Sequence, residues 1–306
     1  MAKEDTLASA KAFLVAEAQL SLWVFKKNAV GFTARSVNVT PALETALRSI
    51  VLTRLARTTE VDEYELLAQT NEVSCLHLES DETSFDILKE LVDRPATENT
   101  ITTTKHLDNS SGYLVRLRQA DQVMYCVRKV DDAWIARKAV NVLNVVVSGA
   151  NQLDLVGGRT LTISNDFDFL ALNDGLLILR KAAFESLLSY RSAYQNSFAS
   201  LQQSPQFSQL FVDLAPLIAH VGTNTMHLRR MAAIEQRAHY ADVHYMARLR
   251  QVNAQKQWGI NFDEQGRIVA TEESLRTIMQ VLLNHRLYSE LSLGTFDVPS
   301  AAQVGA

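Results

Sequence analysis

The sequence contains few of the residues that interrupt regular structure. Only 11 of its 306 residues are Gly and 5 are Pro, whereas typical proteins have about 7% and 5%. The two cysteines, Cys75 and Cys126, are too few for a disulfide framework and lie in strand-like runs. No run approaches the ~20 apolar residues that cross a bilayer. These shortages predict long helices and strands, reduced core thiols and no membrane-spanning helix.

The first 20 residues also lack the basic start, apolar centre and small-residue cleavage site of a secretory signal. Their pattern indicates an amphipathic helix instead. Apolar residues make up 47% of the chain and charged residues 21%, as in globular proteins with a sizeable core. We therefore expect a cytoplasmic protein, which would reach a membrane only through a partner or a surface.

Hydrophobic periodicity predicts an α+β fold with a largely antiparallel central sheet, N-terminal strands and helices, and a mainly helical C-terminal part. We divide the chain into an N-terminal α+β segment (1–110), an antiparallel sheet with its first helix (111–200) and a mainly helical region (201–306). Strands are expected at 20–25, 32–39, 73–78, 113–118, 123–130, 153–156, 160–163, 167–172 and 176–180, and a long Val-rich β run is expected at 134–147. Helices are expected at 41–57, 84–92, 182–197, 206–220, 224–252 and 272–285.

Turn and cap residues support several of these boundaries. Thr40 is placed to cap the helix at 41–57, and Pro41 takes its first position. Hairpin turns are expected at 157–158 (Gly-Gly) and 173–175 (Asn-Asp-Gly), because Gly accepts a positive φ. A smaller hairpin is expected at 260–269, and Thr271 is placed to cap the last helix.

The common enzyme signatures are absent: no phosphate-binding loop, dinucleotide-binding glycine motif, nucleophile elbow or HExxH motif occurs. Asp166 and Asp168 are two apart on an expected strand, so they share a face and could bind Mg²⁺ for phosphodiester hydrolysis. A restriction-type nuclease would have an acid two residues before a lysine on the next strand, and Lys181 lacks that acid. We expect no cofactor and favour a non-enzymatic role, with a metal-dependent nuclease as the alternative.

The net charge of −4 conceals an uneven distribution. Residues 60–99 carry twelve acids against Lys89 and Arg94, while residues 223–256 carry six Arg or Lys against Glu235 and Asp242. Such asymmetry steers one partner and repels another, although uneven charge also occurs by chance.

Two basic patches could contact nucleic acid. On a continuous helix over 224–252, Arg230, Arg237, His244 and Arg248 would fall within about 40° of one another and span roughly 27 Å. Such a row could track phosphates. A solvated helix face explains the same pattern and is the reading that the sequence alone favours. The rival patch lies on the sheet, where residues two apart share a face. Its members are Arg116, Arg118, Arg128, Lys129, Arg137 and Lys138.

Four segments resemble the B subunit of the Kiwa anti-phage system. They are SNDFDF at 164–169, LILRKAAFESLLSY at 177–190, NFDEQGRI at 261–268 and LLNHRLYS at 282–289. In that family a strand pair ends in a lysine and leads into a helix that opens with Phe-Glu, as Lys181, Phe184 and Glu185 do here. The similarity spans roughly residues 160–300.

The resemblance implies a cytoplasmic homo-oligomer that works with a small membrane-embedded A subunit, through which it is recruited to the inner membrane. It also implies DNA binding that restrains phage replication and transcription, and it brings no established catalytic residues. Three functions remain open: a DNA-binding defence subunit, a metal-dependent nuclease, and an interaction scaffold without DNA contact.

Overall fold

The computed structural model of the chain describes residues 3–29, 31–79, 83–94, 100–101, 104–107, 109–130, 145–147, 153–155, 163–172 and 175–298. Packing divides the chain into two compact units. Unit 1 comprises Met1–Tyr64 and Gln69–Leu188, and unit 2 comprises Glu65–Ala68 and Ser189–Ala306. The division of the sequence into segments 1–110, 111–200 and 201–306 stays a prediction.

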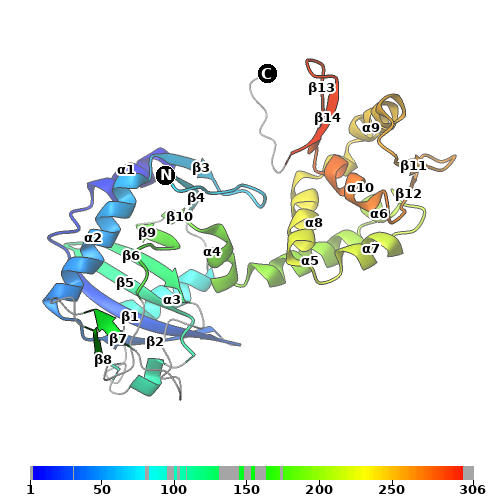
Figure 1. Ribbon diagram of the computed structural model, residues 1–306. Helices are drawn as coiled ribbons and strands as arrows, with labels where there is room; N and C mark the ends of the chain where they lie inside the picture. Colours follow the sequence, from blue (N-terminus) through cyan, green and yellow to red (C-terminus); the bar gives the residue numbers. More distant parts are fainter. Residues whose placement is uncertain are drawn as a thin grey trace. The chain divides into compact units, whose positions relative to one another are not determined.

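Unit 1 is built on an eight-stranded sheet with the order β2-β1-β5-β6-β9-β10-β4-β3 (Figure 1). Every neighbouring pair is antiparallel except β3 with β4. The strands are β1 (Gln19–Asn28), β2 (Gly31–Val37), β3 (Glu60–Glu63), β4 (Ser74–Glu79), β5 (Gly112–Gln119), β6 (Gln122–Lys129), β9 (Phe169–Leu172) and β10 (Gly175–Ile178). The prediction of an α+β protein with a large, mostly antiparallel sheet is thereby confirmed.

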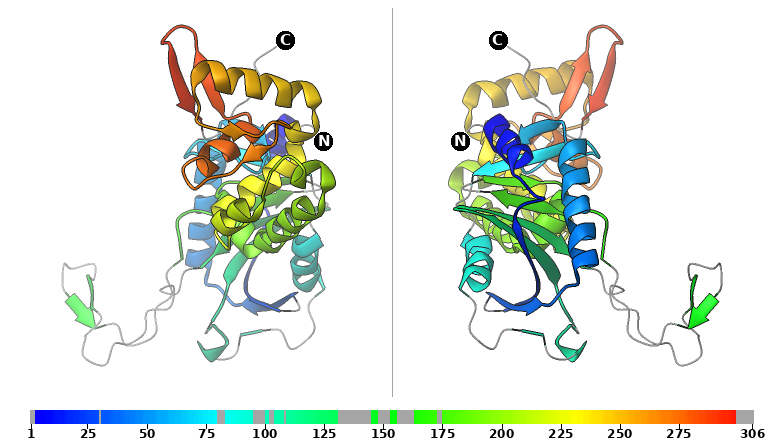
Figure 2. Two further views of the ribbon diagram at one scale, coloured as in Figure 1. Left: turned by 90° about the vertical axis from the view of Figure 1, so that its right-hand side faces the viewer. Right: turned by 90° about the vertical axis from the view of Figure 1, so that its left-hand side faces the viewer.

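Helices cover both faces of this sheet, and Figure 2 shows α2 and α3 on opposite sides of it. Leu7 of α1 and Leu47 of α2 join the apolar cluster that contains Val24 and Val115. On the other face, Phe85 of α3 packs edge-on against Tyr125 and Phe169, and Phe184 of α4 also contacts Phe169. The helical elements of unit 1 are α1 (Lys3–Ala12), α2 (Pro41–Arg57), α3 (Thr83–Asp93), η1 (Thr104–Leu107) and α4 (Lys181–Leu187).

Two predicted turns of unit 1 fall partly or wholly outside the described residues. Of the β runs expected at 134–147 and 153–156, the structure describes β7 (Val145–Val147) and β8 (Leu153–Leu155), which form a separate antiparallel pair. The expected turn at 157–158 and residues 160–162 of the next expected strand lie outside the described residues. The antiparallel pairing of β9 with β10 agrees with the expected hairpin at 173–175. The cap of α2 is confirmed, because the Thr40 hydroxyl accepts a hydrogen bond from Leu43 N.

Unit 2 packs helices and two small hairpins around its own core. Phe207, Met231 and Ile278 are fully buried at its centre. Within the described residues, no helix has the length and apolar character needed to cross a membrane. The elements are α5 (Tyr190–Gln203), α6 (Pro205–Ser208), α7 (Ala215–Val221), α8 (Thr225–Arg237), η2 (His239–Ala241), α9 (Val243–Lys256), β11 (Asn261–Phe262), β12 (Ile268–Val269), α10 (Leu275–Leu282), β13 (Arg286–Ser289) and β14 (Gly294–Asp297).

The prediction of a single helix over 224–252 is wrong, because the chain forms α8 and α9 with a break between them. Ala238 adopts the left-handed conformation, with φ 49°, and ends α8. After the short η2 turn, the Asp242 side chain accepts a hydrogen bond from His244 N and starts α9. Tyr240 fixes the turn by packing its ring against Phe207, with centroids 5.1 Å apart. Because alanine is the best helix former, position 238 gave no sign of a break.

Three further boundaries differ from the expectation. The helix predicted at 182–197 is divided at Ser189, whose φ of 64° separates α4 from α5. The helix predicted at 206–220 is present as the short α6 and α7. The last helix starts at Leu275 and not at 272, because the Ser274 hydroxyl bonds the Thr271 backbone and holds the chain in a turn.

Candidate nucleic-acid interface

The carboxylate of Asp168 is buried and has protein donors at both oxygens. Its Oδ1 accepts a hydrogen bond from Arg128 at 2.9 Å, and its Oδ2 accepts one from Lys129 N at 2.6 Å. Arg180 Nε lies 3.7 Å from Oδ1. Burial raises the pKa of Asp168, while the Lys129 amide and the Arg128 guanidinium act in the opposite direction. With cations and an amide already bound, this carboxylate is better suited to holding the sheet together than to holding Mg²⁺.

Asp166 and Lys181, the other two residues of the nuclease hypothesis, have different partners from those of Asp168. Asp166 accepts a hydrogen bond from Phe167 N at 2.9 Å and lies 3.6 Å from Arg54 Nε. Lys181 pairs with Glu185 at 3.8 Å, and its ammonium lies over the Tyr64 ring. Among the residues that the structure describes, no three His, Cys, Asp or Glu side chains are grouped to hold a metal ion.

The candidate cations on the sheet lie at two ends of β5 and β6. Arg116 and Arg118 share one face, and the register places them opposite Tyr125 and Val123. Lys129 is on the same face but six residues from Val123, which corresponds to about 20 Å along a strand. Arg116 also forms an ion pair with Asp93 at 3.1 Å. Arg118 is exposed.

Arg128 points to the opposite face from Lys129, as neighbouring residues on a strand must. It is mostly buried and bound to Asp168. The last two members of the predicted sheet patch, Arg137 and Lys138, lie outside the described residues. The sheet patch is therefore split among two strand ends and two faces.

A group of four cations lies at one end of the sheet, where β1 and β6 finish. This group, which we name the basic sheet end, consists of Lys27, Arg128, Lys129 and Arg180. Lys129 faces Gly112, and Gly112 faces Phe25, so Lys27 lies two residues further along β1 on the face of Lys129. Burial lowers the pKa of Lys27, and the Lys129 ammonium lowers it further. Asp168 is the only acid that forms ion pairs with these four cations in the described part of the chain.

The sequence alone did not identify Lys27 or Arg180 as members of this group. Lys27 is far from Lys129 in sequence, and only the strand register brings them together. Arg180 follows β10 and is 52% exposed while it contacts Asp168. An alternating pattern predicts which face a residue occupies within its own strand, but it does not predict which strands are neighbours.

The four helix candidates lie on two separate helices. Arg230 and Arg237 belong to α8, and His244 and Arg248 belong to α9. Each pair shares a stripe of its own helix, but the break at Ala238 removes the continuous row. His244 and Arg248 are exposed. Neither forms an ion pair in the described part of the structure, so both remain available to an anion.

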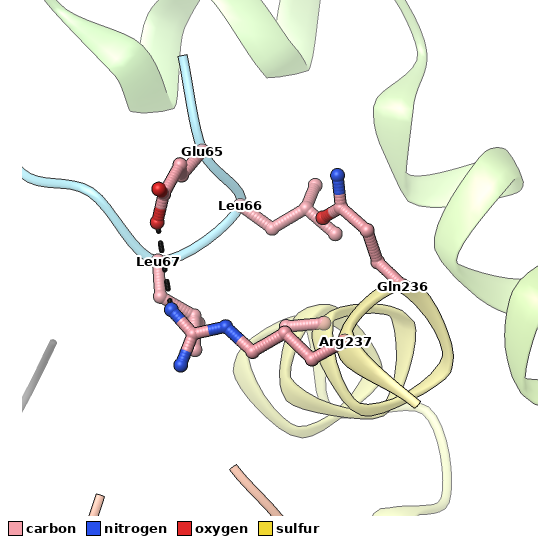
Figure 3. A pocket seen from close by; sticks show the side chains of 6 residues that line it. Glu65, Leu66, Leu67, Gln236 and Arg237 are labelled. Atoms are coloured by element: carbon pink, nitrogen blue, oxygen red, sulfur yellow. Dashed lines mark hydrogen bonds and ion pairs between the residues drawn. The ribbon is translucent and has the colours of Figure 1, made fainter. Parts of the chain in front are cut away.

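Arg237 contacts groups within unit 2. It donates hydrogen bonds to Leu283 O at 2.9 Å and to His285 Nε2 at 2.8 Å. It also lies 3.4 Å from a carboxylate oxygen of Glu65, beside a pocket of about 210 Å³ (Figure 3). Burial lowers the pKa of His285 to about 4, with a further contribution from Arg237. The imidazole is therefore neutral near pH 7 and can accept the hydrogen bond.

The sequence of the chain was compared with known proteins. Neither curated proteins nor solved structures gave a match to the chain. The family described as Kiwa protein KwaB-like matches residues 107–292, which is more than half of the chain. That range contains three cations of the basic sheet end and the α8 and α9 candidates. The chain belongs to the Kiwa KwaB-like family.

Proposed function

We propose that the protein is an anti-phage defence subunit that binds the phosphate backbone of DNA without cleaving it, and that the basic sheet end makes the main contact. Membership of the Kiwa KwaB-like family supports the defence role. The observation that carries the DNA contact is the strand register, which places Lys27 and Lys129 on one face at the same end of the sheet. In agreement with this, burial and then the Lys129 charge lower the pKa of Lys27.

Like charges that share a site repel, and a bound anion relieves that repulsion. A DNA backbone presents phosphates that lysine and arginine neutralise, with release of counterions. Arg180 adds an exposed guanidinium that can bind phosphate oxygens in a forked geometry. The exposed pair His244 and Arg248 forms a second, smaller candidate contact on α9.

The proposal includes the partners that the family resemblance implies. A small membrane-embedded A subunit would bring the protein to the inner membrane, and a homo-oligomer would present several basic sheet ends to one DNA molecule. Several weak contacts on one polyanion add up to strong binding if their spacing fits.

Titration of labelled duplex DNA tests the proposal at two salt concentrations, with and without Mg²⁺. The variant is Lys27→Met with Lys129→Met, and Lys11→Met removes one exposed charge as the control. The double variant should bind every DNA sequence more weakly, and the slope of log K against log salt should become shallower by roughly 0.9 per lost contact. The control should bind as the unchanged chain does.

Other outcomes support other functions. Unchanged affinity and slope in the folded double variant would remove the sheet end from the interface, and a parallel titration of His244→Ala with Arg248→Ala would then test α9. Cleavage that requires Mg²⁺ would support the nuclease. Absence of DNA binding by the unchanged protein would support the scaffold.

A further inference from the structure

A second basic site lies at the edge of the unit 1 sheet, in a pocket of about 340 Å³. Val24 and Lys26 come from β1, and Thr33, Ala34 and Arg35 come from β2. The remaining lining residues are Leu91 of α3 and His106 of η1. The volume falls in the range of small-molecule sites, which begins at about 300 Å³.

The strand register explains why two cations meet here. Lys26 pairs with Thr33 and Val24 pairs with Arg35, so these four side chains form a block on one face of two adjacent strands. Lys26 and Arg35 are diagonal neighbours in this block, about 7–8 Å apart and somewhat less between their Cβ atoms, a separation that long side chains can bridge. Their charged ends can therefore contact one bound group.

The charge of this pocket is not balanced by its own walls. None of the lining residues that the structure describes is acidic. In the described part of the chain, neither Lys26 nor Arg35 forms an ion pair, although both are half-buried. Asp93, at the end of α3, is already bound to Arg116 and to the Tyr125 hydroxyl. A bound anion would supply a counter-charge to Lys26 and Arg35.

Part of the remaining wall is apolar. Val24 lies on the face of Lys26 and Arg35 and is buried, at 5% exposure. Ala34 and Leu91 also line the pocket, but Ala34 alternates with Arg35 and points to the other face, which α3 covers. An inorganic ion would leave this surface in contact with water, whereas a ring or sugar would cover it. The imidazole of His106 offers a stacking surface or a further polar contact.

We propose that this pocket binds a small organic phosphate of the size of a nucleoside monophosphate, with Lys26 and Arg35 holding the phosphate and Val24 and the His106 ring contacting the nucleoside. The site lies on the opposite strand face from Lys27 and does not depend on DNA binding by the basic sheet end.

Calorimetric titration of the full chain with deoxyadenosine 5′-monophosphate tests this proposal, with deoxyadenosine and inorganic phosphate as partial probes. The monophosphate should bind saturably, and both partial probes should bind at least about tenfold more weakly, because each lacks one half of the interaction. Lys26→Met and Arg35→Met keep the apolar stems and remove the charge. Each should weaken monophosphate binding by about tenfold, as expected for loss of a charge-assisted hydrogen bond. Lys11→Met should leave it unchanged.

Three results would overturn the assignment. They are no saturable heat with the monophosphate, equal affinity for inorganic phosphate, or binding that survives both substitutions in chains whose circular dichroism is native. The same variants titrated with duplex DNA separate the two sites. If they lose the monophosphate but keep DNA, the pocket is independent of the basic sheet end. If they lose only DNA, the pocket belongs to the DNA surface and the small-ligand assignment is wrong.

Discussion

At the scale of single residues, Asp168 joins separate segments of unit 1. Its side chain binds Arg128 and the Lys129 amide of β6, and its backbone oxygen accepts hydrogen bonds from Leu179 N and Arg180 N, each at 2.8 Å. Its side chain is 1% exposed. Removal of a charge from such a pair leaves the partner unpaired, which costs more than the pair contributes.

We therefore expect Asp168→Asn to lower the free energy of unfolding by about 3 kcal/mol. Urea unfolding followed by circular dichroism measures this change. Asp166→Asn, at a more exposed carboxylate, should cost less. DNA affinity of either folded variant should stay unchanged or rise, because a negative charge near a polyanion is removed. Strongly reduced affinity in a folded Asp168→Asn variant would contradict this role.

His285 predicts a pH dependence of stability. Its pKa of about 4 in the folded chain lies below the ordinary value of 6.5, so the unfolded chain binds more protons between these pH values. Its contribution to stability is complete above about pH 6.5 and is lost as the pH falls toward 4. His285→Gln keeps an acceptor for Arg237 without titrating. The urea midpoint of this variant should fall less than that of the unchanged chain between pH 7 and pH 5, and parallel curves would exclude the effect.

At the scale of elements, the break between α8 and α9 is the main departure from sequence expectation. Apolar periodicity continues through residues 224–252, so the pattern of burial alone does not reveal a turn. The break depends on local interactions: the left-handed Ala238, the Asp242 cap and the Tyr240 contact with Phe207. Asp242 was the one visible sign, because Asp is a preferred N-cap residue.

A substitution at Ala238 tests the break directly. If residue 238 is in the left-handed conformation at a helix end, Ala238→Gly should raise the free energy of unfolding by roughly 0.5–1 kcal/mol, because glycine has no Cβ that this conformation would strain. In an unbroken helix, the same substitution would lower stability by about 1 kcal/mol. The sign of the change in urea midpoint therefore distinguishes the two arrangements, and Ala247→Gly, within α9, is the matched control that should destabilise.

The strands of unit 1 were easier to predict than the helix boundaries of unit 2. In the sequence, short stretches with Gly or polar residues separate the strand pairs β1–β2 and β9–β10. β1, β9 and β10 each have a buried, β-forming run. β3 and the hairpin of β13 with β14 were missed, since β3 has only a half-buried Val61 among acids. The candidate cations were recognised by type, but their grouping required the strand order, which arises from long-range packing.

At the scale of the whole molecule, the proposed membrane-embedded partner predicts a partner-dependent location. Expressed without the small membrane-embedded A subunit, the protein should stay in the supernatant when membranes are sedimented. Co-expression with that subunit should move it to the membrane pellet. Sedimentation with membranes in the absence of a partner would favour direct binding of a basic surface to anionic lipid, and lipid vesicles of defined charge would then identify that surface.

Because residues 65–68 belong to unit 2, they affect how unit 2 folds during synthesis. Leu66 and Leu67 pack against the core of unit 2 and line a pocket with Ala233 of α8. On the ribosome, these leucines emerge roughly ten to thirty seconds before α8, at typical rates of synthesis. Unit 2 therefore cannot complete its core from its own continuous stretch, and a fragment that starts at residue 189 would leave an apolar groove open to aggregation. If the two units are expressed separately, residues 65–68 must therefore be included with unit 2.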